Sequence, residues 1–361
     1  MGKTIWASRV LSGTLAAALV GLTPALARAA TPPPPPMHAA SAAVLDAATG
    51  QILWQYRGHT RYPMASTTKM MTALIALRLL HDNTSVPMVV PPQVSQAYGE
   101  TLYLKPGQHF TFLQLLEGTL LYSANDAAVA VAVNAAGSQR KFVALMNAEA
   151  NTLGLVDTHY ANPDGLESPD HYSSADDLAR LGLVAMQNPI FRHTVAMTSA
   201  AIPWPGHGNG TRVIGNIDTL LTSFPGATGI KTGYTSEALN VAVGAATRNG
   251  RSVIAVVMGE SEYTLWPDEY ALLNYALQIT PPATGTATPQ LTYTPAGVIT
   301  ARVVPARQPG VARAGSAVPA GLPPAVAEWV LALLAVMGLL AGVYRAVARP
   351  RRRVGRMAGF Q

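Results

Sequence analysis

Residues 62–80 read YPMASTTKMMTALIALRLL, and this stretch is the starting point for predicting the fold. Pro63 precedes Ser66, a residue type common at helix N-termini, and methionine, alanine, leucine and isoleucine dominate the positions that follow. The pattern predicts a helix over residues 66–80. Because apolar side chains surround its axis almost completely, we expect this helix to lie buried at the centre of the fold.

Within this helix, Ser66 and Lys69 form an S-x-x-K motif. Residues three apart share one helix face, so the lysine amine can reach the serine hydroxyl. Burial disfavours the ammonium form and lowers its pKa, and we therefore expect Lys69 to be uncharged at rest. A neutral amine beside a serine is a general base for a nucleophile. The alternative is a helix cap followed by a lysine whose amine reaches solvent.

A second motif, Ser123-Ala124-Asn125, precedes a predicted helix. Serine and asparagine are common in turns that cap helices, so an ordinary capping turn is one interpretation. The other is a site in which the serine relays a proton to a leaving group and the asparagine holds a substrate amide.

A third motif, Lys231-Thr232-Gly233, lies in a predicted strand. The lysine and threonine suit an exposed strand edge. They also suit a site that presents a cation and a hydroxyl to a substrate carboxylate, with the glycine permitting close approach of another backbone.

The remaining pattern predicts an α+β domain. Alternating apolar runs flank a turn at Asp46–Gly50, and Asn249-Gly250, a favoured two-residue hairpin turn, joins two more. Strands at both ends with helices between them suggest that the terminal segments share one antiparallel sheet. The predicted strands are 42–45, 52–56, 229–234, 239–247 and 251–258, and the further helices are 113–122, 126–136, 141–153, 175–186 and 268–278.

The three motifs occur in the order S-x-x-K, S-x-N and K-T-G, as in the penicillin-recognising serine enzymes. Residues 62–73, 162–166 (NPDGL), 171–173 (HYS) and 229–235 (GIKTGYT) closely resemble the serine-type D-alanyl-D-alanine carboxypeptidases, the low-molecular-weight penicillin-binding proteins of peptidase family S11. The resemblance covers residues 39–278. It implies a β-lactamase/transpeptidase-like fold, with an antiparallel sheet flanked by helices and a mostly helical subdomain.

The resemblance also implies a role for each motif residue. Ser66 would attack the carbonyl between the two terminal D-alanines of a peptidoglycan stem pentapeptide, and Lys69 would take its proton. β-Lactam antibiotics would acylate the same serine as covalent inhibitors, and no cofactor or metal is implied. The other assignments are Ser123 as proton relay, Asn125 as peptide holder, Lys231, Thr232 and Gly233 as carboxylate binders, and the backbone N–H groups of Ser66 and Tyr234 as oxyanion hole.

The sequence departs from this family's pattern in two places. Members often carry an arginine soon after a strand that ends in Met-Gly, whereas Met258-Gly259 here leads to Glu260 and Glu262. Carboxylate recognition would then depend more heavily on Lys231. Many members also add a β-rich domain before a membrane-surface helix, and the segment after Gln278 is too short for one.

The net charge of +6 divides unevenly along the 361 residues. Residues 1–37 carry +3, residues 38–280 carry −5 and residues 281–361 carry +8. The globular part is therefore mildly acidic, which argues against a nucleic-acid partner. A chain that is 49% hydrophobic and 12% charged is not disordered, and one without cysteine has no disulfides.

The two basic ends predict export and anchoring. Lys3 and Arg9, an apolar run and Ala27-Arg28-Ala29 predict a signal peptide cut after Ala29, with an uncleaved anchor as the alternative. An apolar segment followed by an arginine cluster predicts one C-terminal span of the bacterial cell membrane, with the catalytic domain outside. The expected divisions are a signal peptide 1–29, a Pro-rich spacer 30–38, the catalytic domain 39–280, a Pro/Ala-rich linker 281–324 in which strands near 291–293 and 298–304 could pair, a transmembrane helix 325–347 and a cytoplasmic tail 348–361.

Other functions stay open on the sequence. A class A-like serine β-lactamase shares the motifs, and Glu167 lies in the interval where that class carries its water-activating glutamate. A peptidoglycan DD-endopeptidase would use the same machinery, and a non-catalytic wall-binding module would use none of it. A metallopeptidase would need clustered ligands, whereas the eight histidines are scattered.

Overall fold

The computed structural model describes residues 32–206, 210–279, 289–291 and 301–303. All of these belong to the first of two compact units into which the chain divides, Met1–Ala306. The predicted signal peptide, transmembrane helix and basic tail lie outside the described residues. Among the helices that are described, none has the length and apolar character needed to cross a membrane.

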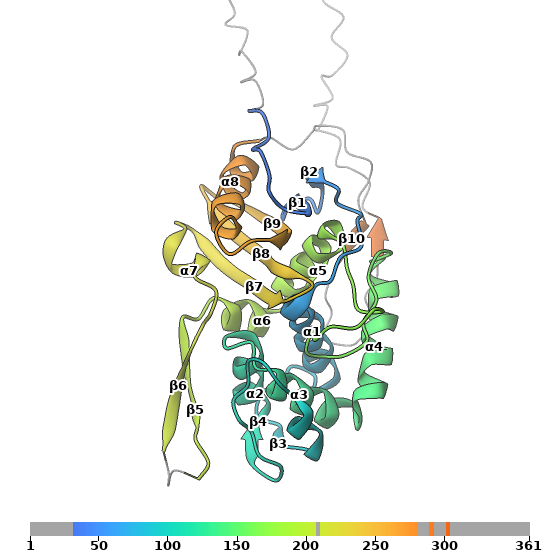
Figure 1. The fold of residues 1–361 in the computed structure, drawn as a ribbon, viewed down its shortest axis with the longest axis vertical. Coiled ribbons are helices and arrows are strands. Elements are labelled where there is room, and N and C mark those ends of the chain that lie inside the picture. Colours follow the sequence, from blue (N-terminus) through green and yellow to red (C-terminus); the bar gives the residue numbers. More distant parts are fainter. Residues whose placement is uncertain (1–31, 207–209, 280–288, 292–300, 304–361) are drawn as a thin grey trace, which may run out of the picture. The chain divides into compact units, whose positions relative to one another are not determined.

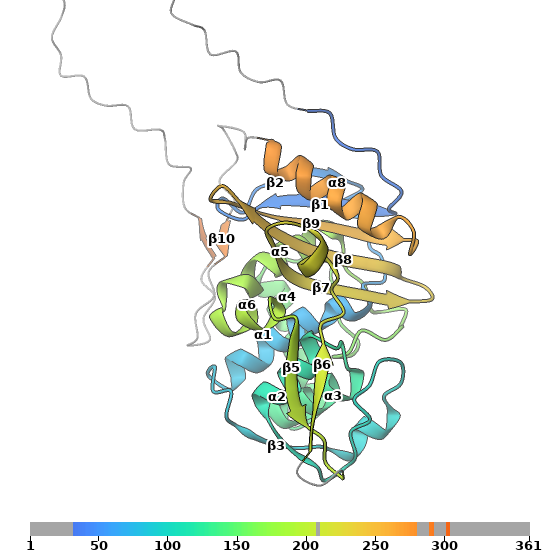
Figure 2. The same cartoon turned by 90° about the vertical axis from the view of Figure 1, so that its left-hand side faces the viewer.

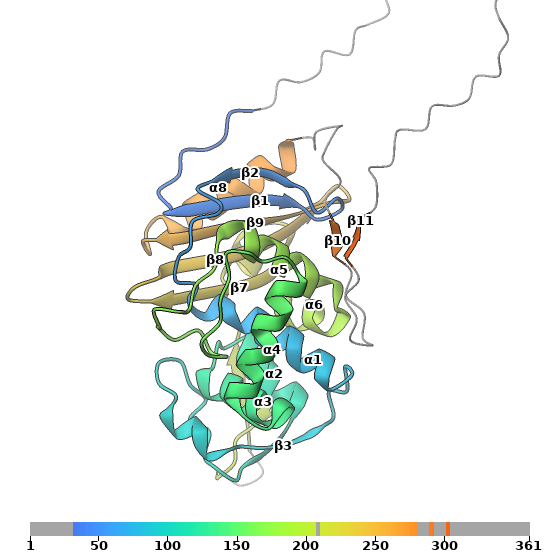
Figure 3. The same cartoon turned by 90° about the vertical axis from the view of Figure 1, so that its right-hand side faces the viewer.

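A five-stranded antiparallel sheet carries the fold, in the order β2-β1-β9-β8-β7 (Figures 1 and 3). The first strand pairs with the last, Val44 lying opposite Ala255, which confirms that the terminal segments share one sheet. Asn249 and Gly250 both have positive φ, the backbone that a tight two-residue hairpin requires. The strands are β1 (Ser41–Asp46), β2 (Ile52–Tyr56), β7 (Ala227–Thr235), β8 (Leu239–Arg248) and β9 (Arg251–Glu260).

Side chains along the central strands point alternately to the two faces of the sheet. Both faces are buried, each in an apolar cluster. Val44 and Val257 pack into the apolar cluster that includes α8 (Leu265–Gln278). Leu45 and Val256 point the other way, into the cluster that includes α5 (Ala175–Gln187). Figure 2 shows α8 along the outer face of the sheet, and β7 at the edge nearest the helical part.

The helical part is built around α1 (Lys69–Leu79), which packs against α2, α3, α4 and α5. Residues 69–77 of α1 are all buried, as the apolar sequence predicts. Its N-terminus differs from the prediction: Ser66 lies in a 3-10 turn, η1 (Ala65–Thr68), and the α-helix begins at Lys69. The surrounding helices are α2 (Phe112–Leu120), α3 (Asn125–Ala136) and α4 (Gln139–Thr152), each within two residues of its predicted bounds.

Several short elements of the domain were not predicted, because segments of seven residues or fewer carry little periodicity. In the linker, β10 (Pro289–Leu291) pairs antiparallel with β11 (Ala301–Val303), so the expected strand pair is present with shifted bounds. The unpredicted elements are β3 (Pro87–Val89), η2 (Pro92–Gln96), β4 (His109–Thr111), α6 (Pro189–Val195), β5 (Ser199–Pro203), β6 (Thr211–Gly215) and α7 (Leu220–Ser223).

Candidate active site

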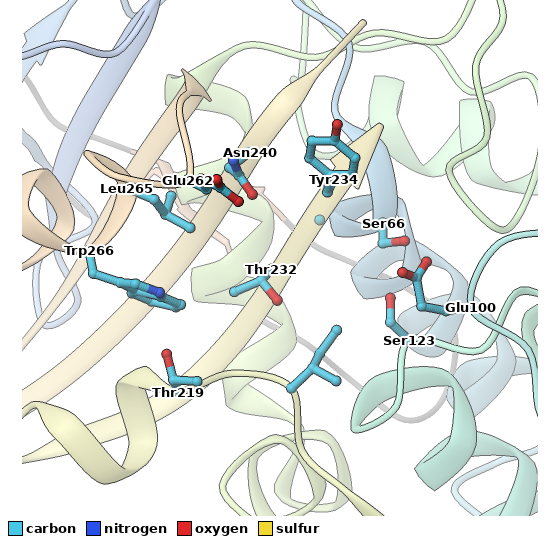
Figure 4. A pocket seen from close by; sticks show the side chains of 12 residues that line it. Ser66, Glu100, Ser123, Thr219, Thr232, Tyr234, Asn240, Glu262, Leu265 and Trp266 are labelled. Carbon is cyan, nitrogen blue, oxygen red and sulfur yellow. The ribbon is translucent and has the colours of Figure 1, made fainter. Parts of the chain in front are cut away.

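The three motifs meet where the edge strand β7 packs on η1, at the start of α1. Ser66 comes from η1, Ser123 and Asn125 from the turn that begins α3, and Lys231–Gly233 from β7. Figure 4 shows the side chains of Ser66, Ser123 and Thr232 around one cleft, which all three line. Three segments far apart in the sequence thus build a single site.

Lys69 is fully buried beside the hydroxyl of Ser66. Its Nζ donates to Ser66 Oγ at 2.8 Å, to Asn125 Oδ1 at 2.6 Å and to the carbonyl oxygen of Asp164. An ammonium has three donors, so these acceptors use all of them and fix the side chain in one orientation. The alternative of a lysine that reaches solvent is therefore excluded.

The backbone around Ser66 directs its hydroxyl to the lysine. Ala65, just before it, has a φ of 47°, a left-handed conformation that is strained for a residue with a Cβ and typical of functional sites. Thr67 Oγ1 and Thr68 Oγ1 donate to carbonyl oxygens three residues earlier, at 2.6 and 2.8 Å. No side-chain bond caps η1, so the alternative interpretation of this motif as a helix cap is not supported.

Burial lowers the pKa of Lys69 to about 8, while the nearby carboxylates of Asp164, Glu100 and Asp126 oppose this shift by favouring the ammonium. The predicted direction is right. A pKa of about 8 lies close to neutral pH, so Lys69 gives up its proton far more readily than an exposed lysine. The uncharged state at rest stays a prediction.

Lys231 forms a second buried lysine–serine pair. It is 1% exposed although its strand forms the sheet edge, which excludes the exposed-edge interpretation. Its Nζ donates to Ser123 Oγ at 3.1 Å and to the carbonyl oxygen of Thr232 at 2.8 Å. Burial, together with the positive charge of Lys69, lowers the pKa of Lys231 to about 7, against the opposing effect of the Asp218 carboxylate.

The turn at Ser123 serves this site rather than capping a helix. Ser123 has a left-handed φ of 64°, and α3 has no side-chain bond at its N-cap, Ala124. Asn125 accepts from Lys69 and donates from Nδ2 to the carbonyl oxygen of Tyr98 at 2.6 Å. The capping interpretation of this motif is therefore excluded.

Two glycines allow two other backbone segments to approach the nucleophile turn closely. A Cβ at Gly233 would lie 2.6 Å from the backbone nitrogen of Ser66, so only glycine brings β7 this near. A Cβ at Gly165 would lie 2.2 Å from the carbonyl oxygen of Ala65. The close approach at Gly233 puts the backbone that leads into Tyr234 beside the Ser66 N–H, where the oxyanion hole is expected.

Residues 27–262 match the D-alanyl-D-alanine carboxypeptidase family, peptidase S11. The chain belongs to this family. It is 41% identical over 246 residues to the D-alanyl-D-alanine carboxypeptidase DacB2 of Mycobacterium tuberculosis, an alignment that covers 66% of this chain and 82% of the relative. It is 33% identical to the carboxypeptidase DacF of Bacillus subtilis, covering 62% of this chain and 58% of that one.

Solved structures of the S11 carboxypeptidases and their neighbours share the fold. A D-alanyl-D-alanine carboxypeptidase from Mycobacterium tuberculosis H37Rv superposes with a TM-score of 0.65 at 37% identity, covering 70% of this chain and 96% of the other. The Streptomyces K15 DD-transpeptidase superposes with a TM-score of 0.65 at 30% identity, covering 69% and 100%. The predicted β-lactamase/transpeptidase-like α+β fold is confirmed.

In this S11 carboxypeptidase, residues 162–166 form a loop that supports Lys69 from behind. The Asn162 side chain closes the loop, accepting from Gly165 N at 2.7 Å and donating to the Leu166 carbonyl oxygen at 2.8 Å. Thr72 Oγ1 of α1 then donates to the Pro163 carbonyl oxygen at 2.6 Å, next to the Asp164 carbonyl that accepts from Lys69. The sequence pattern NPDGL marks this loop but does not reveal its contact with the lysine.

His171 supports the nucleophile turn as a neutral group. Its Nε2 lies 2.7 Å from Thr68 Oγ1, and its Nδ1 accepts from the Ala161 N–H at 3.0 Å. An acceptor at Nδ1 leaves the proton on Nε2, which donates to the threonine. Burial lowers the pKa of His171 to about 3, so the imidazole is a fixed hydrogen-bonding partner rather than a proton carrier.

A cleft extends past the nucleophile in two directions, with volumes of about 260 and 290 Å³. Ser66, Glu100 and Tyr234 line both parts. No sequence motif contains Glu100, and nothing in the pattern around it predicts its place here. Among the other lining residues are Ser123, Thr232, Asn240, Glu262 and Trp266 in the first part, seen in Figure 4, and Tyr98, Asn125, Leu166, Glu167 and Thr235 in the second.

Proposed function

We propose that Ser66 is the nucleophile with which this S11 enzyme removes the terminal D-alanine of peptidoglycan stem pentapeptides. The observation that carries the proposal is the 2.8 Å hydrogen bond from buried Lys69 Nζ to Ser66 Oγ, at a cleft that both flanking motifs line. Membership of the carboxypeptidase family supports the reaction, and the motif geometry supports the role of each residue.

Acylation follows from this geometry. Lys69, once deprotonated, takes the proton of Ser66 Oγ, which attacks the carbonyl carbon between the two D-alanines. The N–H groups of Ser66 and Tyr234 stabilise the oxyanion, a pair of donors worth a few kcal/mol at the transition state. Ser123, held by Lys231, gives its hydroxyl proton to the departing D-alanine amine and receives in turn the proton that Lys69 took from Ser66. Water then hydrolyses the acyl-Ser66 ester.

Recognition of the terminal carboxylate is assigned to Lys231 and Thr232. The Thr232 side chain faces the cleft in Figure 4, and the Lys231 amine lies behind it, bonded to the Thr232 carbonyl oxygen. None of the described residues that line the two parts of the cleft is an arginine. A carboxylate beside Lys231 raises its pKa and holds it in the charged form.

The location of the enzyme is a further part of the proposal and rests on the sequence alone. A signal peptide over residues 1–29 and a membrane helix over residues 325–347 would place the catalytic domain outside the bacterial cell membrane and the basic tail in the cytoplasm. Substrate lies on that outer side, which agrees with the proposed activity.

A fluorescent penicillin tests the nucleophile. The wild-type enzyme should be labelled covalently, and Ser66→Ala should lose labelling entirely while keeping its thermal unfolding midpoint. Labelling retained by Ser66→Ala would move the acyl-enzyme to another residue and refute the assignment.

A pentapeptide ending in D-Ala-D-Ala tests the reaction. Mass spectrometry should show loss of one D-alanine with the wild-type enzyme and none with Ser66→Ala. A β-lactamase would release penicilloate within seconds and leave the pentapeptide intact, and a wall-binding module would leave both unchanged. A cross-linked peptide dimer in the same assay measures DD-endopeptidase activity separately.

A further inference from the structure

A carboxylate that belongs to none of the three motifs reaches into the catalytic cleft. Glu100 lines both parts of the cleft together with Ser66. Figure 4 shows its carboxylate between the side chains of Ser66 and Ser123, with Thr232 and Tyr234 on the opposite wall. Its negative charge favours the ammonium form of both lysines of the site.

The catalytic motif itself holds Glu100 in place. The Asn125 backbone N–H donates to the Glu100 carbonyl oxygen at 2.8 Å, and the Asn125 side chain donates to the Tyr98 carbonyl oxygen at 2.6 Å. Just beyond, the Leu102 and Leu104 N–H groups each donate to the Asp126 carboxylate at 2.9 Å. These bonds hold the backbone of the segment beside the motif, and the exposed Glu100 side chain lines the cleft.

Glu167, another glutamate of the cleft, has different partners. Glu167 lines only the second part of the cleft. Its Oε1 accepts from Ser236 Oγ at 3.0 Å and from the Glu237 N–H at 2.8 Å. Those bonds tie the Glu167 carboxylate to the end of β7. Its place in the sequence makes Glu167 a candidate for the water-activating glutamate of a β-lactamase. In the structure, its carboxylate instead holds the segment after β7.

We propose that Glu100 is a further catalytic residue, whose carboxylate accepts a proton from the water that hydrolyses the acyl-Ser66 ester. The inference rests on the proposed function, since it needs that ester to form. Departure of D-alanine empties the part of the cleft that Ser123, Thr232 and Glu100 line. Water that enters there reaches the ester carbonyl from the side of the leaving group, with the Glu100 carboxylate beside it.

The step balances without another reactant. The water oxygen bonds to the acyl carbon as Glu100 takes one water proton, and the N–H groups of Ser66 and Tyr234 hold the oxyanion. The tetrahedral intermediate collapses with cleavage of the bond from carbon to Ser66 Oγ. That oxygen leaves with the proton that Glu100 accepted, and the shortened peptide departs as its carboxylic acid.

Single-turnover kinetics with a peptide ending in D-Ala-D-lactate test the inference, because D-lactate departs as D-alanine does, whereas an opened penicillin keeps its leaving group attached. The Glu100→Gln enzyme is acylated, excess depsipeptide is removed, and loss of the acyl group is followed by intact-protein mass spectrometry. Deacylation should slow about 100-fold, the lower end of the range for loss of a general base. Acylation should stay within about threefold of wild type, because removing a carboxylate lowers the pKa of Lys69 and leaves the base at least as available.

Two matched variants separate a proton acceptor from a simple change of charge. Glu100→Asp keeps a carboxylate on a shorter arm and should recover at least about tenfold of the lost deacylation rate. Glu237→Gln removes the same charge from an exposed position on the loop after β7 and should change deacylation by less than about threefold.

Each contrary result is informative. A Glu100→Gln enzyme that deacylates within about threefold of wild type overturns the inference and leaves the proposed function standing. Equal slowing of acylation and deacylation in Glu100→Gln also overturns it, because a group needed only by the water step cannot affect both. A wild-type enzyme that forms no acyl-enzyme overturns the proposed function and the inference together.

Discussion

The active site contains two buried lysines held by different kinds of structure. Lys69 starts a central helix and donates to Ser66 in the preceding turn and to acceptors from two other parts of the chain, whereas Lys231 lies in an edge strand and donates to Ser123 and to its own strand. Burial lowers both pKa values, to about 8 for Lys69 and about 7 for Lys231. Burial alone therefore does not decide which lysine stays charged; the surrounding acceptors and charges do.

The proposed chemistry needs a neutral general base and a charged carboxylate binder, whereas burial disfavours the charge of both lysines. In that chemistry, the terminal carboxylate of the substrate beside Lys231 raises the pKa of that amine, and a charged Lys231 in turn favours the neutral form of Lys69. Substrate binding would therefore favour the basic form of Lys69.

The largest loss of acylation rate is expected when residue 69 can no longer act as a base. Lys69→Arg keeps a positive charge on α1 but cannot act as a base, so acylation by fluorescent penicillin should fall about 10³-fold or more. Lys69→Met, which removes the charge as well, should lose a similar factor. Circular dichroism and the thermal midpoint check that each variant folds. An acylation rate above about a tenth of wild type in either variant would show that another group is the base.

The second prediction concerns Lys231, the proposed carboxylate binder. The wild-type enzyme should prefer a peptide ending in a free D-Ala-D-Ala carboxylate over the same peptide ending in an amide, because a charge-assisted hydrogen bond is worth about 1.5–3 kcal/mol. Lys231→Ala should reduce this ratio of kcat/KM values by about 10- to 100-fold. Lys231→Ala also removes the hydrogen bond that positions Ser123, which should slow both peptides equally. The ratio of their kcat/KM values therefore reports recognition of the terminal carboxylate alone. An unchanged ratio would assign recognition to another residue.

The sequence predicts the sheet and the meeting of the motifs better than it predicts the state of the site. Strands β1 and β9 are nearly continuous apolar runs, as two buried faces require, and the motif order carries the family resemblance. The charge of Lys69 could not be predicted, because it depends on Asp164 and Asn125, which arrive from loops 95 and 56 residues away. Glu100 lies outside every motif, and long-range bonds from Asn125 and Asp126 hold its segment beside the cleft.

The smallest predicted effect is on the pH range in which Lys69 is neutral while Lys231 is still charged. In free enzyme, kcat/KM should rise with pH as Lys69 loses its proton and fall as Lys231 loses its own, giving a narrow maximum between about pH 7 and 8. The two limbs are properties of the coupled pair rather than of single residues. The Asp218 carboxylate, itself buried with a pKa raised to about 6, favours the charged form of Lys231.

Asp218→Asn removes that negative charge with little change of shape. The Asp218 Oδ1 accepts from the Leu220 N–H at 3.0 Å, and asparagine can accept the same bond. Without the carboxylate the pKa of Lys231 falls, so the alkaline limb of kcat/KM should move to lower pH by up to about one unit, while the acid limb moves less. Rates for the D-Ala-D-Ala peptide between about pH 6 and 10 measure both limbs. If the alkaline limb stays in place or moves to higher pH, the charge of Lys231 is set by the substrate carboxylate and the other lysine alone, and the difference between the two lysines owes nothing to Asp218.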